Sequence, residues 1–166
     1  MARQNKEKYF NETIAYRNRN PLNIRYSKTV KWLGQEGEWR GFVRFRGFEY
    51  GYRAAVKILR TYQQRGIHSI RDIVRTWAPP NENKTDQYVR AVLQFMSPRQ
   101  SEPYVVDSTT KIDLKNRTIV VQLLLAMTRV EMGANAAQVY SMRTYAEMGY
   151  DLAVTTPGFF SPPSGK

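Results

Sequence analysis

One long apolar stretch constrains the fold of this chain more than any other feature. It runs from Asn116 to Gly133 and reads NRTIVVQLLLAMTRVEMG. Apolar residues fill almost every position from Ile119 to Val130, so the predicted helix has almost no polar face. Asn116 is suited to cap its first turn, and Gly133 is suited to end it in a left-handed conformation. Because such a helix is normally buried on every side, we expect the domain to pack around it.

Glu131 lies in the last turn of this predicted helix. The negative end of the helix dipole disfavours the charged form of a carboxyl group placed there. Stability alone would avoid this placement, so a functional role is one interpretation. The other interpretation is that Glu131 points into solvent or pairs with a base such as Arg129 or Arg143. Spacing by itself favours this second, structural interpretation.

The composition argues against several classes of function. At 166 residues, the chain is long enough for one domain with a real core. It has no cysteine and one histidine, His68, which argues against disulfides, thiolate or histidine metal sites and Ser–His catalysis. No metal or organic cofactor is implied. The polar N-terminal sequence lacks a signal peptide, and the longest apolar run is too short to cross a bilayer. We therefore expect a chain made in the host cytoplasm, with no transmembrane segment.

The positive charge is concentrated near the N-terminus. The net charge is +12, and residues 1–66 hold 15 Lys and Arg against 5 Asp and Glu. A field of this sign attracts polyanions, such as nucleic acid, anionic lipid or the acidic polymers of a bacterial cell wall. Charge alone does not choose among them.

The N-terminal part of the chain predicts a turn and a small sheet. Residues 1–16 are polar and predict a flexible arm or a marginal helix ending near Asn18. Pro21 then sets a turn that feeds a short strand, with Asn20 and Asn23 either holding the turn or binding a ligand. Glycines divide residues 30–48 into an antiparallel hairpin. Its aromatic residues alternate with arginines, so it either covers one side of the core or stacks on RNA bases.

The rest of the chain predicts helices. Helical periodicity indicates them at residues 49–66, 70–77, 83–96 and 141–153. Ser69 is the expected cap of the second, and Asn83 or Thr85 the expected cap of the third. Residues 104–106 predict a brief extended piece. The chain is thus expected to be α+β and mainly α, with an arm (1–16), one domain (17–153) and a loose tail (154–166).

Short motifs follow one another in a distinctive order. They are N-P-L-N-I-R at 20–25, W-L-G-Q at 32–35, G-F-V-R-F at 41–45, E-Y-G-Y-R-A at 49–54, W-A-P-P-N-E-N-K-T at 77–85 and R-V-E-M-G at 129–133. This order resembles a group of phage virion-associated proteins with a lysozyme-like fold, some of which are cell-wall lysins. Their last motif reads R-H-E-N-G, so Val130 and Met132 depart from it, and Leu22 replaces a glycine in the first.

The resemblance implies both a fold and an activity. It implies a lysozyme-like domain over residues 17–153, with a circularly permuted helix order because the helix carrying the acid follows the Asn-containing turn. It also implies that Glu131 is the catalytic acid of a muramidase or lytic transglycosylase that cleaves the β-1,4 glycan of peptidoglycan. Such a protein is expected to be virion-associated and to act at the host periplasm or cell wall.

Further site residues follow from the same resemblance. Glycosidases usually need two carboxylates, and Glu49 or Glu82 is the candidate for the second, although each also suits a helix start or a loop. A transglycosylase with a single acid fits the lack of an obvious partner better. The candidate sugar-binding residues are Asn20, Asn23 and Arg25 through hydrogen bonds and Trp32 or Tyr88 through ring stacking.

Two other classes of function remain open. The first is a non-catalytic phage structural protein or basic nucleic-acid-binding virion component, which the charge and the residues beside Glu131 support. Its partners would be nucleic acid or other virion proteins instead of peptidoglycan. The second is a helical DNA-binding fold using the helices near 70–77 and 83–96. Only Arg71 and Arg75 are basic on the shorter of these helices, a thin supply for DNA contacts.

Overall fold

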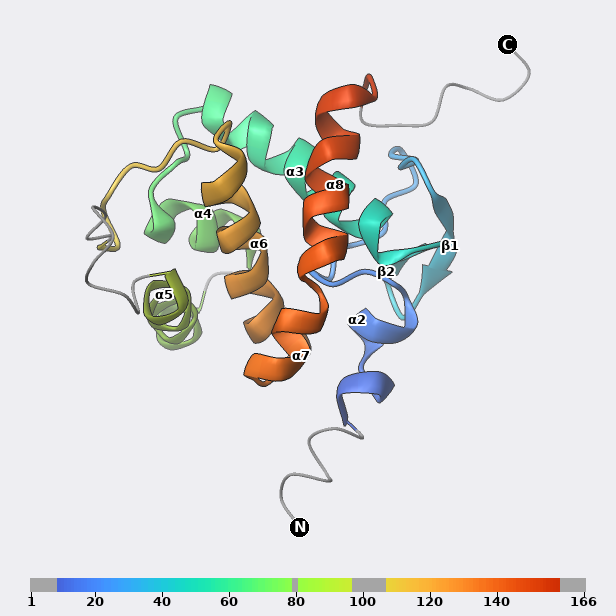
Figure 1. Cartoon of the computed structure of the whole chain (residues 1–166), viewed down its shortest axis with the longest axis horizontal. Helices are drawn as coiled ribbons and strands as arrows, with labels where there is room; N and C mark the ends of the chain where they lie inside the picture. The colour runs from blue at the N-terminus through green and yellow to red at the C-terminus, as the bar shows by residue number, and fades with distance from the viewer. Residues whose placement is uncertain (1–8, 79–80, 97–106, 159–166) are drawn as a thin grey trace.

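The structure, a computed structural model, describes residues 9–78, 81–96 and 107–158. Helices dominate it, and a single two-stranded antiparallel sheet lies near the N-terminus of the described chain (Figure 1). This confirms the prediction of a mainly helical α+β protein. The elements are α2 (Ile14–Arg17), β1 (Gln35–Trp39), β2 (Phe42–Phe45), α3 (Phe48–Gln64), α4 (Ile70–Trp77), α5 (Glu82–Met96), α6 (Arg117–Met132), α7 (Ala136–Ser141) and α8 (Arg143–Thr155).

Helix α6 is the centre of the fold. It contacts α5 on one side and α8 on the other (Figure 1). Its caps are those expected from the sequence: the side chain of Asn116 accepts a hydrogen bond from the Ile119 N–H at 3.1 Å, and Gly133 adopts a left-handed φ of 61°. Its side chains from Val120 to Thr128 are buried except at Gln122. The prediction of a central buried helix is confirmed.

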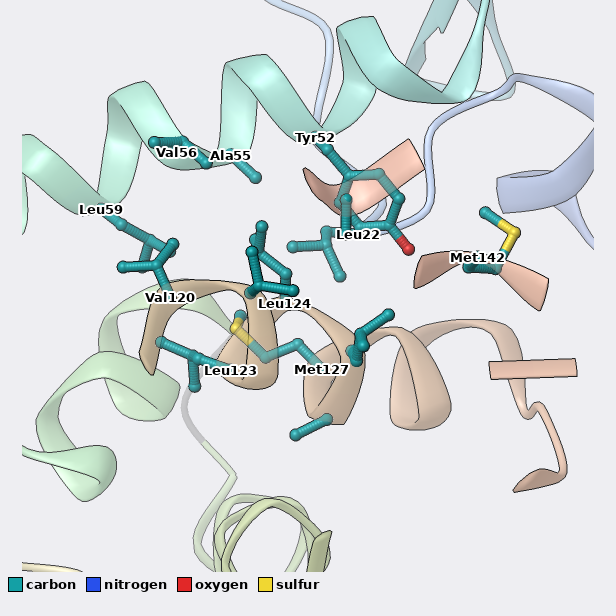
Figure 2. Close-up of a cluster of buried hydrophobic side chains, with 14 of the residues drawn as sticks. Leu22, Tyr52, Ala55, Val56, Leu59, Val120, Leu123, Leu124, Met127 and Met142 are labelled. Carbon is teal, nitrogen blue, oxygen red and sulfur yellow. The ribbon is translucent and has the colours of Figure 1, made fainter. Parts of the chain in front are cut away.

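The main core forms where α3 lies across α6. Leu59 and Val56 of α3 lie among apolar side chains of α6 such as Leu124 and Val120 (Figure 2). Tyr52 and Thr128 bring polar groups into this core, and their hydroxyl oxygens are 2.7 Å apart. Thr128 donates to the Leu124 carbonyl at 2.7 Å, so the Tyr52 hydroxyl is the donor to Thr128. Both buried hydroxyls are thereby satisfied, which avoids the penalty of an unpaired buried polar group.

Helix α8 packs closely against α3 at Gly149. A Cβ added at this position would clash with the Cβ of Tyr52 and would lie 2.9 Å from backbone atoms of Arg53 and Glu49. Glycine therefore allows the two helices to approach each other. This contact joins the last helix of the described chain to α3.

The predicted hairpin is confirmed. Strands β1 and β2 pair antiparallel with Trp39 opposite Phe42 and Glu38 opposite Val43. Arg40 and Gly41 have φ values of 57° and 86°, which match the type I′ turn favoured between two twisted strands. Val43 and Phe45 are buried, so one face of the sheet covers part of the core.

Helical structure is present before residue 17, within the segment predicted as an arm or a marginal helix. Residues 9–12 are helical, and Thr13 caps α2 by accepting from the Tyr16 N–H at 3.2 Å. The rings of Phe10 and Tyr16 are 5.2 Å apart, as are those of Tyr16 and Phe48. These contacts fix residues 9–16 against α3, so the alternative of a short helix ending near Asn18 is the correct one for this part of the chain.

The described chain also extends past residue 153, the predicted end of the domain. Helix α8 continues to Thr155, and residues 156–158 are bound to α3 instead of forming a loose tail from residue 154. Arg53 donates to the Thr156 hydroxyl at 2.8 Å and to the Gly158 carbonyl at 3.0 Å, and Lys57 donates to the Thr156 carbonyl at 2.7 Å. Residues 159–166 lie outside the described chain.

Two helix starts differ from the prediction. The side chain of Asn81 accepts from the Lys84 N–H at 3.3 Å, so α5 begins at Glu82 and neither Asn83 nor Thr85 is its cap. Helix α7 occupies a segment predicted as a loop, and its Asn135 forms a capping box. The extended piece predicted at residues 104–106 lies outside the described residues.

A candidate acid site in a cleft

A tightly bonded turn prepares one side of the site. Asn20 is fully buried, and its side-chain amide donates to the carbonyls of Ile24 and Val43 and accepts from the Ile24 N–H, each at 2.9 Å. Asn20 therefore holds the turn and does not line the cleft described below. Asn23 follows with a φ of 52°, a left-handed conformation that asparagine tolerates better than most residues. The turn directs the Asn23 side chain toward the end of α6.

Glu131 is the acid at the end of α6, and it is half-buried. Asn23 donates through Nδ2 to its Oε1 at 3.4 Å and to its backbone carbonyl at 3.3 Å. The hydroxyl of Tyr88 on α5 donates to Oε2 at 3.0 Å. Residues far apart in the sequence thus hold one carboxyl group in place.

The surroundings of Glu131 favour its protonated form. Burial raises the pKa of Glu131, while hydrogen bonds from Tyr88 and Asn23 and the positive charge of Arg25 act in the opposite direction. Burial, followed by the charge and hydrogen bond of Glu131, raises the pKa of Tyr88 well above its ordinary value. Glu131 therefore keeps a proton to a higher pH than an exposed glutamate, as a general acid requires.

Glu131 opens onto a cleft of about 400 Å³. Its lining residues come from the 22–32 segment, β2, α3, the end of α4 and the end of α6; they are Leu22, Asn23, Ile24, Arg25, Ser27, Val30, Trp32, Phe42, Ile58, Tyr62, Trp77, Ala78 and Glu131. Of these lining residues, Glu131 is the one acid and Arg25 the one base. The cleft thus combines an apolar and aromatic wall with a few polar groups, as is typical of ligand-binding sites.

The polar groups of the cleft leave one acceptor available. The Oδ1 atom of Asn23 is buried and has no hydrogen-bond partner among the described residues. The exposed Arg25 lies with its guanidinium 5.2 Å from the centre of the Phe42 ring. A ligand with hydroxyl or amide groups would meet both an acceptor and donors beside the carboxyl of Glu131.

The structure brings together many of the residues selected from the sequence. Asn23, Arg25, Trp32 and Glu131 line the cleft. Tyr88 contacts Glu131 through its hydroxyl and is not among the lining residues. Trp32 itself is buried.

The two candidates for a second carboxylate have different outcomes. Glu49 lies in the first turn of α3 and does not line the cleft. Glu82 begins α5, and its side chain lies outside the described part of the structure.

Three aromatic residues that line the cleft were not selected as site residues from the sequence: Phe42, Tyr62 and Trp77. Trp77 donates through its indole N–H to the Leu22 carbonyl at 3.2 Å, which joins the end of α4 to the Asn20–Arg25 turn. Its ring lies 6.3 Å from that of Tyr62 in an edge-to-face arrangement. The motif at 77–85 was a usable signal for Trp77, whereas nothing in the local sequence distinguishes Tyr62 from a core residue of α3.

The expected ion-pair alternatives for Glu131 are not formed. Arg143 bonds Glu147 on its own helix at 2.9 Å, and Arg129 is exposed. Among the described residues, the side-chain oxygens of Glu131 accept from the neutral donors of Tyr88 and Asn23.

The described parts of the chain contain no group of three or more His, Asp or Glu side chains arranged to hold a metal ion. Nor does any helix in the described ranges combine the length and apolar character needed to span a bilayer.

Fold and cleft together define a small, mainly helical protein with one half-buried acid in an aromatic cleft. No known protein-family model matches the chain. The chain is 34% identical over 117 residues to protein P5 of Pseudoalteromonas phage PM2, a match that covers 60% of this chain and 69% of that protein. The chain belongs to the family of this phage protein. The relationship supports the phage part of the resemblance found in the sequence and does not bear on its lysozyme-like part.

Proposed function

We propose that this phage protein cleaves the β-1,4 glycan of peptidoglycan, with Glu131 as the general acid. The observation that carries the proposal is a half-buried carboxyl group with a raised pKa that faces a cleft of about 400 Å³. The proposal includes a lysozyme-like, circularly permuted arrangement of the helices. It also includes a place in the virion, beside other virion proteins, from which the enzyme reaches the host cell wall.

Glu131 would act first as an acid. Its carboxyl proton passes to the glycosidic oxygen while the bond between that oxygen and C1 of the sugar breaks, leaving positive charge on the sugar ring. Tyr88 and Asn23 would hold the carboxyl group in one orientation. Arg25 and the free acceptor of Asn23 would bind sugar hydroxyl or N-acetyl groups.

The second step distinguishes a hydrolase from a transglycosylase. A hydrolase usually has a second carboxylate about 5–9.5 Å from the acid, and among the residues lining this cleft Glu131 is the one acid. This supports a single-acid transglycosylase. The ionised Glu131 would then take a proton from a hydroxyl group of the same sugar as that oxygen attacks C1, giving an anhydromuramic end.

A zymogram with purified peptidoglycan tests the proposal. The wild type and the Glu36→Gln variant, which changes an exposed acid on β1, are expected to clear the gel, and Glu131→Gln is not. Equal clearing by all three proteins would remove Glu131 from the mechanism. Anhydromuramic ends in the soluble product identify the transglycosylase, and reducing muramic ends identify the hydrolase.

The second candidate is a non-catalytic phage structural protein or a basic nucleic-acid-binding virion component. The family match supports this candidate more directly than the first, because the name of the related phage protein does not describe an enzyme. The concentration of positive charge in residues 1–66 supports it as well. An inactive wild type that binds DNA or RNA in a salt-dependent manner would make this candidate the better account.

A further inference from the structure

A second cavity of about 400 Å³ lies where the helices before residue 18 meet the hairpin. It shares no lining residue with the Glu131 cleft, and its lining residues are Asn11, Tyr16, Arg17, Asn18, Arg19, Trp39 and Arg44. The lining thus includes three arginines and no acid. Its volume falls within the range of about 300–1,000 Å³ that is common for small-molecule sites.

Aromatic rings hold two of these arginines in place. The Arg17 guanidinium carbon lies 5.9 Å from the centre of the Trp39 ring, and that of Arg19 lies 5.0 Å from the centre of the Tyr16 ring. Arg19 also donates through Nη1 to the Tyr16 carbonyl at 3.1 Å, and its remaining N–H groups, like those of Arg17, can donate to an anion. Among the described residues, none of Arg17, Arg19 and Arg44 is within 4.0 Å of a carboxylate. None of these three arginines therefore forms an ion pair with a described acid.

A buried acceptor lies in the same cavity wall. Asn18 is fully buried, and its Nδ2 donates to the Trp39 carbonyl at 3.1 Å. This bond fixes the orientation of the amide, and its Oδ1 atom has no partner in the described part of the chain. An unpaired buried acceptor is costly, so a ligand that donates a hydrogen bond here would gain affinity.

The sheet face beside the cavity is open. Arg44 on β2 pairs with Gly37 on β1, so the two positions share one face of the hairpin. No heavy atom lies within 4 Å of the place where a Cβ of Gly37 would be. The space above Gly37 is therefore open beside Arg44 on this face of the hairpin.

We propose that this cavity binds one nucleotide unit of a single-stranded nucleic acid. The phosphate would contact Arg17, Arg19 and Arg44, and a base or sugar donor would bond Asn18 Oδ1. The charge of residues 1–66 favours a polymeric anion over a single phosphate, because a long strand exchanges many counterions for the protein's cations. This site is separate from the acid cleft and gives the nucleic-acid-binding candidate a defined location.

Fluorescence anisotropy with a labelled single-stranded oligonucleotide tests the site. The key variant is the double mutant Arg17→Gln/Arg44→Gln, and the matched control is Arg75→Gln/Arg90→Gln, which removes the same charge from exposed positions on α4 and α5. The pocket variant is expected to bind about tenfold more weakly at about 0.15 M salt. The magnitude of its slope of log affinity against log salt is expected to fall by about 1.4, because two phosphate contacts are lost. The control is expected to stay close to the wild type.

Three outcomes would overturn the inference. Equal weakening by both double mutants would refute the pocket and leave a diffuse basic surface as the nucleic-acid candidate. Absence of binding by the wild type would refute the pocket and that candidate together. Binding to anionic phospholipid vesicles that the pocket variant loses, without binding to the oligonucleotide, would assign the cavity to a lipid phosphate. Unchanged circular dichroism and thermal melting of the variants exclude unfolding as a cause.

Discussion

The hydrogen bond between Tyr88 and Glu131 is the best defined contact of the acid site, and a double-mutant cycle can measure it. Replacing Tyr88 by Phe removes the hydroxyl that donates to Glu131 Oε2 at 3.0 Å and keeps the buried ring. A hydrogen bond to an ionised partner contributes about 1.5–3 kcal/mol, and one between neutral groups about 0.5–1.5 kcal/mol. We therefore expect Tyr88→Phe to destabilise the protein more when Glu131 is ionised.

The cycle uses the wild type, Tyr88→Phe, Glu131→Gln and the double mutant. Equilibrium urea unfolding at a pH above the pKa of Glu131 gives the four free energies of unfolding. In the Glu131→Gln background, Tyr88→Phe is expected to cost about 0.5–1.5 kcal/mol, so the coupling energy between the two positions is about 1 kcal/mol. On the acid side, where Glu131 is protonated, this coupling is expected to shrink.

A coupling energy below about 0.3 kcal/mol on the alkaline side would refute this reasoning. It would mean that Glu131 does not depend on Tyr88, and that the carboxyl group is satisfied by solvent or by Asn23. An equal coupling energy on both sides of the titration would show that the bond does not distinguish the two protonation states of Glu131.

Further predictions concern the same carboxyl group and the helices that support it. Folding raises the pKa of Glu131, so the stability that this group contributes is present at low pH and is lost as pH rises through the folded-state pKa. In urea unfolding, Glu131→Gln is therefore expected to be more stable than the wild type at alkaline pH, with a smaller difference at acid pH. In a clearing assay, Tyr88→Phe is expected to move the alkaline limit of activity to higher pH, since the lost hydrogen bond favours the ionised acid; a move to lower pH would contradict this assignment. Met127→Ala, at a fully buried position of α6, is expected to lower the free energy of unfolding by about 2–5 kcal/mol, whereas Met148→Ala, at a position 44% exposed, should change it by about 0.5 kcal/mol or less. Gly149→Ala is expected to lower the melting temperature, because inserting a methyl group between α8 and α3 costs about 1–3 kcal/mol, whereas the gain in helix propensity is about 1 kcal/mol. An unchanged melting temperature would show that the two helices can separate without cost.

Local sequence patterns predict the elements whose ends and faces are marked by several residues at once. Helix α6 has a capping Asn116, a long apolar run and a left-handed Gly133, and all three features agree. Helix α7 was missed because six residues are too few to show a helical period. The start of α5 was misplaced because Asn81, Asn83 and Thr85 are all acceptable caps, and only the folded backbone selects Asn81.

The residues of the acid site were predictable to the extent that short motifs carry them. Glu131, Asn23 and Arg25 do line one cleft, but the sequence does not reveal which amide of the turn faces inward, so Asn20 was selected although it holds the turn. Tyr88 was expected to offer its ring to a sugar, whereas its hydroxyl contacts the acid. Such roles depend on packing between distant elements, which local periodicity does not encode.

The pairing of α3 with α8 has a consequence for how the protein is made. The Arg53–Thr156 bond joins residues separated by 103 positions, so α3 emerges from the ribosome long before the helix that covers it. Contacts of this range slow folding, because a long loop must close before they form. During synthesis the part of α3 that packs against α8 therefore remains uncovered until α8 has been translated.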